Sequence, residues 1–310
     1  MSWRVVVLSR SAKADYKMDY LIVRTPEAVS RVHISEISVL IIESTAVSIT
    51  SYLLCELIKH KVKIIFCDHM RNPCAELQPC YGSHDASDKL RQQIQWSSQA
   101  KQNVWTEIIR RKLYEQSALL SKLGLPQHAL LDKYSDELLP GDSTNREGHA
   151  AKVYFNALWG KDFSRSQDNA VNAALNYGYS LLLSAFNREI AAAGYTTQLG
   201  ISHNNTFNHF NLSCDFMEPL RPLIDAKVAK MAPIQFEREE KMQLVELLNN
   251  TVIIDGQRQY LLLAIRIYCA GLLKALQKNK LSEIKWINYA SMPKEKHPAD
   301  TVSESDEAEK

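Results

Sequence analysis

The sequence predicts an α+β protein of more than one domain, in which a β-rich N-terminal domain precedes an all-α C-terminal domain. Three observations support this fold class. Short β-branched runs fill residues 1–82, helical periodicity dominates afterwards, and a stretch rich in Pro, Cys, Gly and Asp separates the two at residues 68–87. We therefore expect a β domain over residues 1–84, a helical domain over 85–290 and a disordered acidic tail over 291–310.

The β domain is predicted to contain five strands and one helix. Between the fourth and fifth strands, residues 48–59 change to helical spacing, with Ile49, Leu53 and Leu57 on one face. We therefore expect a single helix among the strands. Apolar, β-branched runs of strand length occur at residues 5–8, 20–23, 32–34, 39–42 and 62–66.

The C-terminal domain is predicted to be helical almost throughout. Apolar residues recur at helical spacing along residues 87–123, which predicts one long helix ending near Gly124. Residues 252–254 are β-branched and predict a short strand or hairpin arm. Further helices are expected at 129–138, at 145–158 with Ser143 or Thr144 as its cap, at 168–193, from Ser213 onward, at 235–248 and at 257–278.

The composition excludes several classes of protein. The tail at 291–310 has three basic and six acidic residues, so the rest of the chain has a net charge of +5, which permits nucleic-acid binding without requiring it. The six cysteines show no CxxC spacing, and no apolar run reaches about 18 residues. We therefore expect a cytoplasmic protein with reduced thiols and no membrane segment. The motifs of zincin proteases, P-loop ATPases, α/β-hydrolases and Rossmann dehydrogenases are absent.

One histidine and two carboxylates on separate segments form the most informative pattern. Glu147 falls in the first turn of its predicted helix, on the same face as Tyr154, although the helix dipole alone would also favour an acid there. His203 and Glu218 lie fifteen positions apart in an unusually polar stretch. One imidazole and two carboxylates can bind a hard divalent cation and leave positions open for water and phosphate.

The residues around Glu218 allow more than one interpretation. Ser213 is predicted as the N-cap of its helix, which places Asp215 in the first turn, where a capping or helix-dipole role would explain an acid. Pro219 predicts either a kink or a later helix start. Arg221 is expected to form an ion pair or to reach a phosphate.

The basic residues of the 87–123 helix either track a DNA backbone or form a solvated face; they include Arg110, Arg111 and Lys112.

Four segments together resemble a known family. They are REGHAAKVYF at 146–155, DNAVNAALNYGY at 168–179, GISH at 200–203 and FNLSCDFMEPLRP at 210–222. Their joint pattern is similar to the CRISPR-associated endonuclease-integrases of spacer acquisition, most of all to the type II-A branch. This resemblance covers the chain to about residue 278 and implies the same two-domain fold.

The resemblance also implies a site and an activity. Glu147, His203 and Glu218 fall on the family's catalytic metal ligands for Mg²⁺ or Mn²⁺, and Asp215 would be a further ligand, a partner of one, or a cap. The implied reaction inserts short DNA fragments into a repeat array of a bacterial genome, through attack of a 3′-hydroxyl on a phosphodiester. The implied partners are double-stranded DNA (prespacer and repeat array), a second copy of the chain, and a small ferredoxin-like adaptation dimer. Candidate contacts to phosphate or DNA are Arg146, Lys152, Arg165, Asn176 and Tyr177.

Two alternatives remain open from the sequence. The same metal site would serve a structure-selective nuclease that cuts branched or recombination-intermediate DNA. A non-catalytic DNA-binding scaffold would instead use the three residues as a buried polar cluster.

Overall fold

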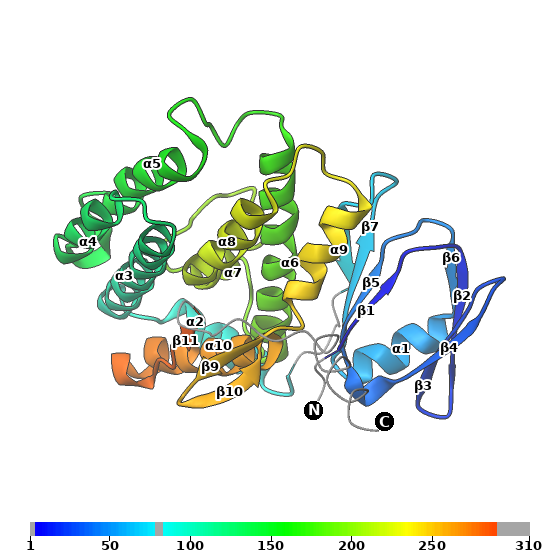
Figure 1. The fold of residues 1–310 in the computed structure, drawn as a ribbon. Helices are drawn as coiled ribbons and strands as arrows, with labels where there is room; N and C mark the ends of the chain where they lie inside the picture. Colours follow the sequence, from blue (N-terminus) through cyan, green and yellow to red (C-terminus); the bar gives the residue numbers. More distant parts are fainter. Residues whose placement is uncertain (1–3, 78–82, 290–310) are drawn as a thin grey trace, which may run out of the picture.

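The computed structural model describes residues 4–77 and 83–289, and the predicted acidic tail lies outside the described residues. Strands dominate the N-terminal part and helices the C-terminal part, which confirms the predicted fold class (Figure 1). The elements of the N-terminal part are β1 (Arg4–Leu8), β2 (Ala12–Lys17), β3 (Tyr20–Arg24), β4 (Val29–His33), a 3₁₀ turn (Ile34–Glu36), β5 (Ile37–Ile42), β6 (Val47–Ile49), α1 (Ser51–Lys59), β7 (Lys63–Cys67) and β8 (Pro73–Leu77).

These strands form two sheets with a core between them. In the first sheet, β1, β5 and β7 are parallel and β8 pairs antiparallel at the edge, in the order β1-β5-β7-β8. The second sheet has the order β4-β3-β2-β6. Helix α1 places its fully buried Leu53 and Leu57 in this core, together with Leu21 of the second sheet and Leu40 of the first.

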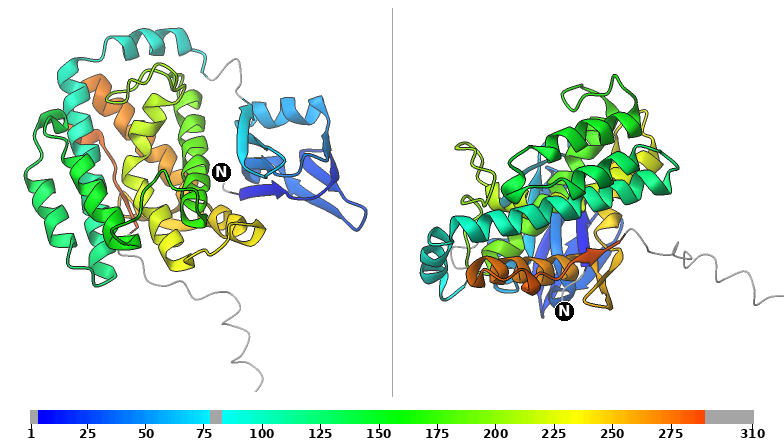
Figure 2. Two further views of the ribbon diagram at one scale, coloured as in Figure 1. Left: turned by 90° about the horizontal axis from the view of Figure 1, so that it is seen from above. Right: turned by 90° about the vertical axis from the view of Figure 1, so that its left-hand side faces the viewer.

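The central strand β5 is buried on both faces, and this joins the two halves of the molecule. Its side chains alternate, so that Leu40 and Ile42 face the core of the β part, whereas Val39 and Ile41 belong to the helical core. The left view of Figure 2 shows the helices gathered beside this sheet, with α6 next to it.

The helical part is built around α6. This helix contacts α7, α8, α9 and α10, and it also touches β7 and β8 of the first sheet. The elements are α2 (Ala86–Ile94), α3 (Ser98–Lys122), α4 (His128–Asp136), a 3₁₀ turn (Pro140–Asp142), α5 (Arg146–Trp159), α6 (Ala170–Ala192), α7 (Asn211–Met217), a 3₁₀ turn called η3 (Glu218–Leu220), α8 (Arg221–Met231), α9 (Arg238–Leu247), β9 (Thr251–Ile254), β10 (Gln257–Tyr260), α10 (Leu261–Lys278), a 3₁₀ turn (Leu281–Glu283) and β11 (Ile287–Asn288).

Several predicted boundaries were wrong. The single helix expected over 87–123 is two helices, because Ser97 accepts a hydrogen bond from the Ala100 N–H and so begins α3 anew. Residues 257–260 form β10 of a hairpin with β9 rather than the start of the last helix. The 68–87 segment, expected to be a loop, contains the edge strand β8, which tolerates Pro73 because edge strands have free N–H positions.

Two predicted caps were also wrong. The cap of α5 is Asn145, in a left-handed conformation with φ of 52°, and not Ser143 or Thr144. Helix α7 begins at Asn211, so Ser213 lies inside it and is fully buried. Within residues 4–77 and 83–289, no helix combines the length and the apolar character needed to cross a membrane.

Candidate functional site

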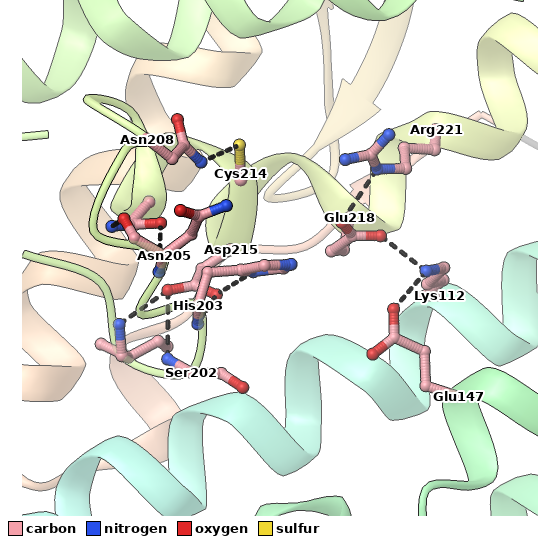
Figure 3. A network of polar contacts seen from close by, with 12 residues as sticks. Lys112, Glu147, Ser202, His203, Asn205, Asn208, Cys214, Asp215, Glu218 and Arg221 are labelled. Atoms are coloured by element: carbon pink, nitrogen blue, oxygen red, sulfur yellow. Dashed lines mark hydrogen bonds and ion pairs between the residues drawn. The ribbon is translucent and has the colours of Figure 1, made fainter. Parts of the chain in front are cut away.

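The first turn of α5 directs Glu147 toward α3. Asp142, just before the helix, accepts hydrogen bonds from the backbone N–H groups of Arg146 at 2.8 Å and Glu147 at 3.0 Å. These bonds satisfy two of the N–H groups that a helix start leaves unpaired, so the Glu147 side chain is not needed as a cap. Figure 3 shows the Glu147 carboxylate pointing at Lys112 of α3.

Glu218 lies at the bend between α7 and α8. It opens the η3 turn, and Pro219 follows it, which agrees with the kink that Pro219 predicted. The residue is only 3% exposed, and Arg221 of α8 donates from Nε to Glu218 Oε1 at 2.9 Å. The expected ion pair of Arg221 is therefore confirmed, and its partner is one of the three proposed ligands.

Lys112 connects the two carboxylates. Its Nζ lies 2.6 Å from Glu147 Oε1 and 2.6 Å from Glu218 Oε2 (Figure 3). Burial by itself would raise the pKa of Glu218, but the charges of Arg221 and Lys112 outweigh it and lower that pKa to about 2. For Lys112, burial opposes the charged form, yet the two glutamates raise its pKa above the usual value. The site is thus a cluster of charged groups in which Lys112 and Glu218 are buried and Glu147 is partly exposed.

His203 lies in the loop between α6 and α7, and Asp215 organises that loop. The buried Asp215 carboxylate accepts the backbone N–H groups of Ile201 at 2.6 Å, Ser202 at 3.2 Å and His203 at 3.0 Å. Its Oδ1 also lies 2.6 Å from Nδ1 of the His203 ring. Asp215 is therefore the hydrogen-bond partner of the histidine, and it binds the N–H groups of the loop before the helix rather than capping its own helix. Its role at a metal stays a prediction.

This arrangement leaves Nε2 of His203 directed toward the charged cluster. Figure 3 shows the ring extending from Asp215 in the direction of Lys112 and Glu218, and Trp105 of α3 packs edge-on to the ring at 5.8 Å. The hydrogen bond with Asp215 raises the pKa of His203, burial opposes this, and the nearby charges of Glu218 and Glu147 add to the rise. A cavity of about 430 Å³ is lined by His203 and its neighbours in the loop, together with residues of α2 and α3.

The donor set suits a hard divalent cation. Glu147 and Glu218 already share one positive charge between them, and Asp215 fixes the imidazole in the way that carboxylates fix metal-binding histidines. Among the described residues, however, no three His, Cys, Asp or Glu side chains are arranged to hold a metal ion as they stand. The Lys112 ammonium group lies between the two carboxylates, 2.6 Å from each.

The predicted DNA contacts differ in their surroundings. Lys152 is exposed, but Arg146 pairs with Glu137 at 2.8 Å. Arg165 is partly buried and donates to Oδ1 of the exposed Asn176 at 2.6 Å. Tyr177 is only 3% exposed and packs edge-on against a phenylalanine ring, so burial argues against the prediction that it contacts DNA.

The basic residues predicted on the 87–123 helix make contacts within the protein, and their contact with DNA stays a prediction. Arg110 donates to the Ser135 carbonyl, Arg111 pairs with Glu115 at 2.6 Å, and Lys112 is buried. The sequence contained a signal for Lys112, because it lies four residues after the buried Ile108 on the apolar stripe of the helix.

Comparisons with known proteins agree with this fold. The model of the family "CRISPR associated protein Cas1" matches residues 5–244. The CRISPR-associated endonuclease Cas1 of Neisseria meningitidis serogroup C (strain 8013) is 33% identical over 271 residues, which is 86% of this chain and 89% of that protein.

Two solved structures have a similar fold at lower identity. A casposase bound to an integration product has a TM-score of 0.72 at 18% identity, covering 90% of this chain and 92% of the casposase. A chain of a Cas6-RT-Cas1–Cas2 complex has a TM-score of 0.70 at 17% identity and covers 94% of this chain and 36% of that chain. The family match covers well over half of the sequence, and the chain belongs to the Cas1 family of CRISPR-associated proteins.

Proposed function

We propose that this protein is a divalent-metal-dependent DNA endonuclease and integrase that inserts short DNA fragments into a CRISPR array. The observation that carries the proposal is the convergence of Glu147 from α5 and Glu218 from the α7–α8 bend on one positive charge, with His203 directed toward them. The Neisseria relative is named as an endonuclease, and the casposase was solved with an integration product, which supports both activities.

Glu147, Glu218 and His203 would bind Mg²⁺ or Mn²⁺, with Mn²⁺ accepting the imidazole nitrogen more readily. When bound, the ion supplies Lewis acidity at the phosphate and lowers the pKa of a coordinated hydroxyl. With metal bound, a neutral His203 would donate its Nδ1 proton to Asp215, and its Nε2 lone pair would bind the ion. Arg221 holds the Glu218 carboxylate in place through a 2.9 Å hydrogen bond.

The proposed reaction exchanges one phosphodiester for another. A 3′-hydroxyl of the incoming fragment attacks a phosphorus of the array, one P–O bond forms, and the bond to the leaving 3′-oxygen breaks, with the proton passing from the attacking to the leaving hydroxyl. Because the number of bonds is unchanged, no covalent intermediate with the protein is needed. Water in place of the 3′-hydroxyl gives nicking.

The same proposal includes partners. A duplex fragment has two ends to be joined, so two active sites at a fixed distance are required, and this favours a homodimer paired across a partner. The similarity to a chain of the Cas6-RT-Cas1–Cas2 complex supports a Cas2-like partner here. The small ferredoxin-like dimer predicted from the sequence would fill that role.

A joining assay tests the function. The protein and its partner are incubated with a duplex bearing 3′-hydroxyl ends, a supercoiled plasmid that contains the repeats, and Mn²⁺ or Mg²⁺. We expect joined products that disappear on chelation, and a loss of at least about 100-fold in Glu147→Ala, His203→Ala and Glu218→Ala variants. The exposed Glu239→Gln on α9 is the matched control and should retain activity.

The alternatives give different results in the same assay. Cleavage of the DNA substrates without joining would support the structure-selective nuclease. Full metal-dependent activity in all three alanine variants would overturn the assignment of the site. DNA binding without any reaction in the wild type would support the scaffold.

A further inference from the structure

Lys112 lies where a cation shared by the two glutamates would lie. Its side chain is 9% exposed, and it reaches the site from α3, whereas the glutamates come from α5 and the α7–α8 bend. Its neighbours Ile108, Ile109 and Leu113 are fully buried apolar residues. An ammonium group in such surroundings is costly unless carboxylates surround it, and here two of them do, each at 2.6 Å.

The contacts of Glu218 leave little room for a second cation. Oε1 of Glu218 accepts from Arg221 at 2.9 Å, and Oε2 accepts from Lys112 at 2.6 Å. Magnesium binds carboxylate oxygens at about 2.0–2.1 Å, and so would come very close to the ammonium group if both used the same oxygens. Two such positive charges repel strongly in a site with little water. One cationic partner must therefore leave before a divalent ion uses both glutamates.

Lys112 is the partner that can leave. Arg221 is held in place, because its guanidinium also lies over the Tyr179 ring at 4.7 Å and because it follows Glu218 by only three residues in the chain. Lys112 instead has a single ammonium group on a flexible four-carbon side chain. A rotation of that side chain releases Glu147 and Glu218 together.

From this geometry, and resting on the metal site of the proposed function, we propose that Lys112 is the built-in counterion of the metal-free site and competes with the divalent cation for Glu147 and Glu218. The lysine keeps the two carboxylates paired and positioned before metal arrives. Its release is then a step in metal binding, and the strength of its ion pairs sets the metal affinity. A purely structural ion pair would stabilise the fold without changing that affinity.

Direct measurement of Mn²⁺ binding tests the proposal without DNA or activity. The full chain is titrated with Mn²⁺, and the free ion is followed by electron paramagnetic resonance. We expect Lys112→Met to bind Mn²⁺ at least about tenfold more tightly than the wild type, because the competing charge is gone. Lys122→Met, the same change at an exposed position of the same helix, should bind like the wild type.

Thermal unfolding gives a second measurement on the same variants. Without metal, Lys112→Met should melt below the wild type, because two carboxylates have lost their shared partner. With saturating Mn²⁺ the variant should gain more in Tm than the wild type gains. Equal Mn²⁺ affinity in Lys112→Met and wild type would overturn the role of Lys112 and leave the metal site intact. Mn²⁺ binding that Glu147→Ala and Glu218→Ala do not weaken would instead overturn the site itself.

A measurement on the wild type covers the case in which Lys112→Met does not fold. Acetic anhydride modifies accessible lysines, and mass spectrometry of peptides measures each one. Lys112 should be protected without metal and become reactive when Mn²⁺ is bound, whereas the exposed Lys122 should react equally in both states. Unchanged protection of Lys112 in the Mn²⁺-saturated protein would contradict its release.

Discussion

At the scale of single residues, Asp215 and Gly200 determine the position of the His203 ring and its loop. Asp215 gathers three backbone N–H groups and the imidazole around one carboxylate. Gly200 makes this possible, because a Cβ there would lie 2.3 Å from the His203 carbonyl oxygen and 2.8 Å from Asp215 Oδ2. Any larger residue at position 200 would push the histidine loop away from its carboxylate.

Asp225 gives a prediction about pH. Burial raises its pKa from 3.8 to about 6, against the opposing hydrogen bonds from the Tyr179 and Tyr154 hydroxyls. The folded pKa lies above the unfolded one, so the neutral acid favours the fold below about pH 4, and this contribution is lost as the pH rises through about 6. Relative to Asp225→Asn, the wild type should lose on the order of 2 kcal/mol of stability across that range.

Urea unfolding at several pH values between about 4 and 7 checks this difference. The exposed Asp162→Asn serves as the control and should follow the pH dependence of the wild type. A parallel course for wild type and Asp225→Asn would show that Asp225 does not titrate differently in the folded state.

The site was predictable from sequence only in part. The resemblance singled out Glu147, His203 and Glu218, which the structure places around one cluster, although metal binding itself stays a prediction. The central position of Lys112 was missed because it follows Arg110 and Arg111, and a run of basic residues usually indicates a solvated face. The four-residue spacing from Ile108 indicated that Lys112 lies on the buried face of its helix, but such a spacing does not show which carboxylates the lysine contacts.

At the scale of elements, the close packing of α6 on α8 holds the Glu218 bend in place. Gly178 of α6 lies against Ile224 of α8, and a Cβ at position 178 would come within 2.5 Å of Ile224 Cγ2. Elsewhere in a helix, alanine in place of glycine would stabilise by about 0.5–1 kcal/mol. At position 178 the clash between the new Cβ and Ile224 opposes this stabilisation.

Gly178→Ala should therefore destabilise the protein, by about 1–3 kcal/mol, because the two helices must separate or Ile224 must leave its preferred conformation. Combined with Ile224→Ala, which removes the colliding methyl group, the change should cost less than the sum of the single variants. Urea unfolding measures each. Ser180→Ala on the same helix should change stability by less than about 0.5 kcal/mol, and a stabilising Gly178→Ala would contradict the packing argument.

The elements themselves were easier to predict than their ends. Helical periodicity located α3, α5 and α6. It did not reveal the break between α2 and α3 at residues 95–97, because the apolar stripe continues across this short break and its serine cap. Strand β8 was missed because Pro73 and Cys74 resemble loop composition, and only pairing with β7 makes them a strand.

At the scale of the whole molecule, the two halves share the β1-β5-β7-β8 sheet. The uninterrupted apolar run of β5 predicted a strand, and such runs are typical of strands covered on both faces. What covers the second face was not predictable, because it comes from the helical core, in which α6 contacts the neighbouring strands β7 and β8 from more than a hundred residues later. The limits of the predicted domains stay a prediction, as does the type II-A branch.

A buried ion pair at this junction gives the last prediction. Lys63 of β7 is 4% exposed and lies 2.6 Å from Glu76 of β8, whose other oxygen accepts from Asn187 of α6 at 3.2 Å. Glu76→Gln leaves the Lys63 ammonium group buried without a carboxylate, and should cost about 3–5 kcal/mol. The double variant Lys63→Met, Glu76→Gln should cost clearly less, because no charge is left unpaired. Urea unfolding measures both, and equal losses would contradict this account.

The position of Lys112 between Glu147 and Glu218 also has a practical consequence for handling the protein. Because the opposite charges of this site balance one another within the protein, the site can form without a bound metal ion. Treatment with EDTA should therefore abolish the catalytic activity and leave the fold and the circular dichroism spectrum unchanged. Under the proposed metal-dependent function, we expect that the protein can be purified without activity, bound to DNA, and activated by adding the metal.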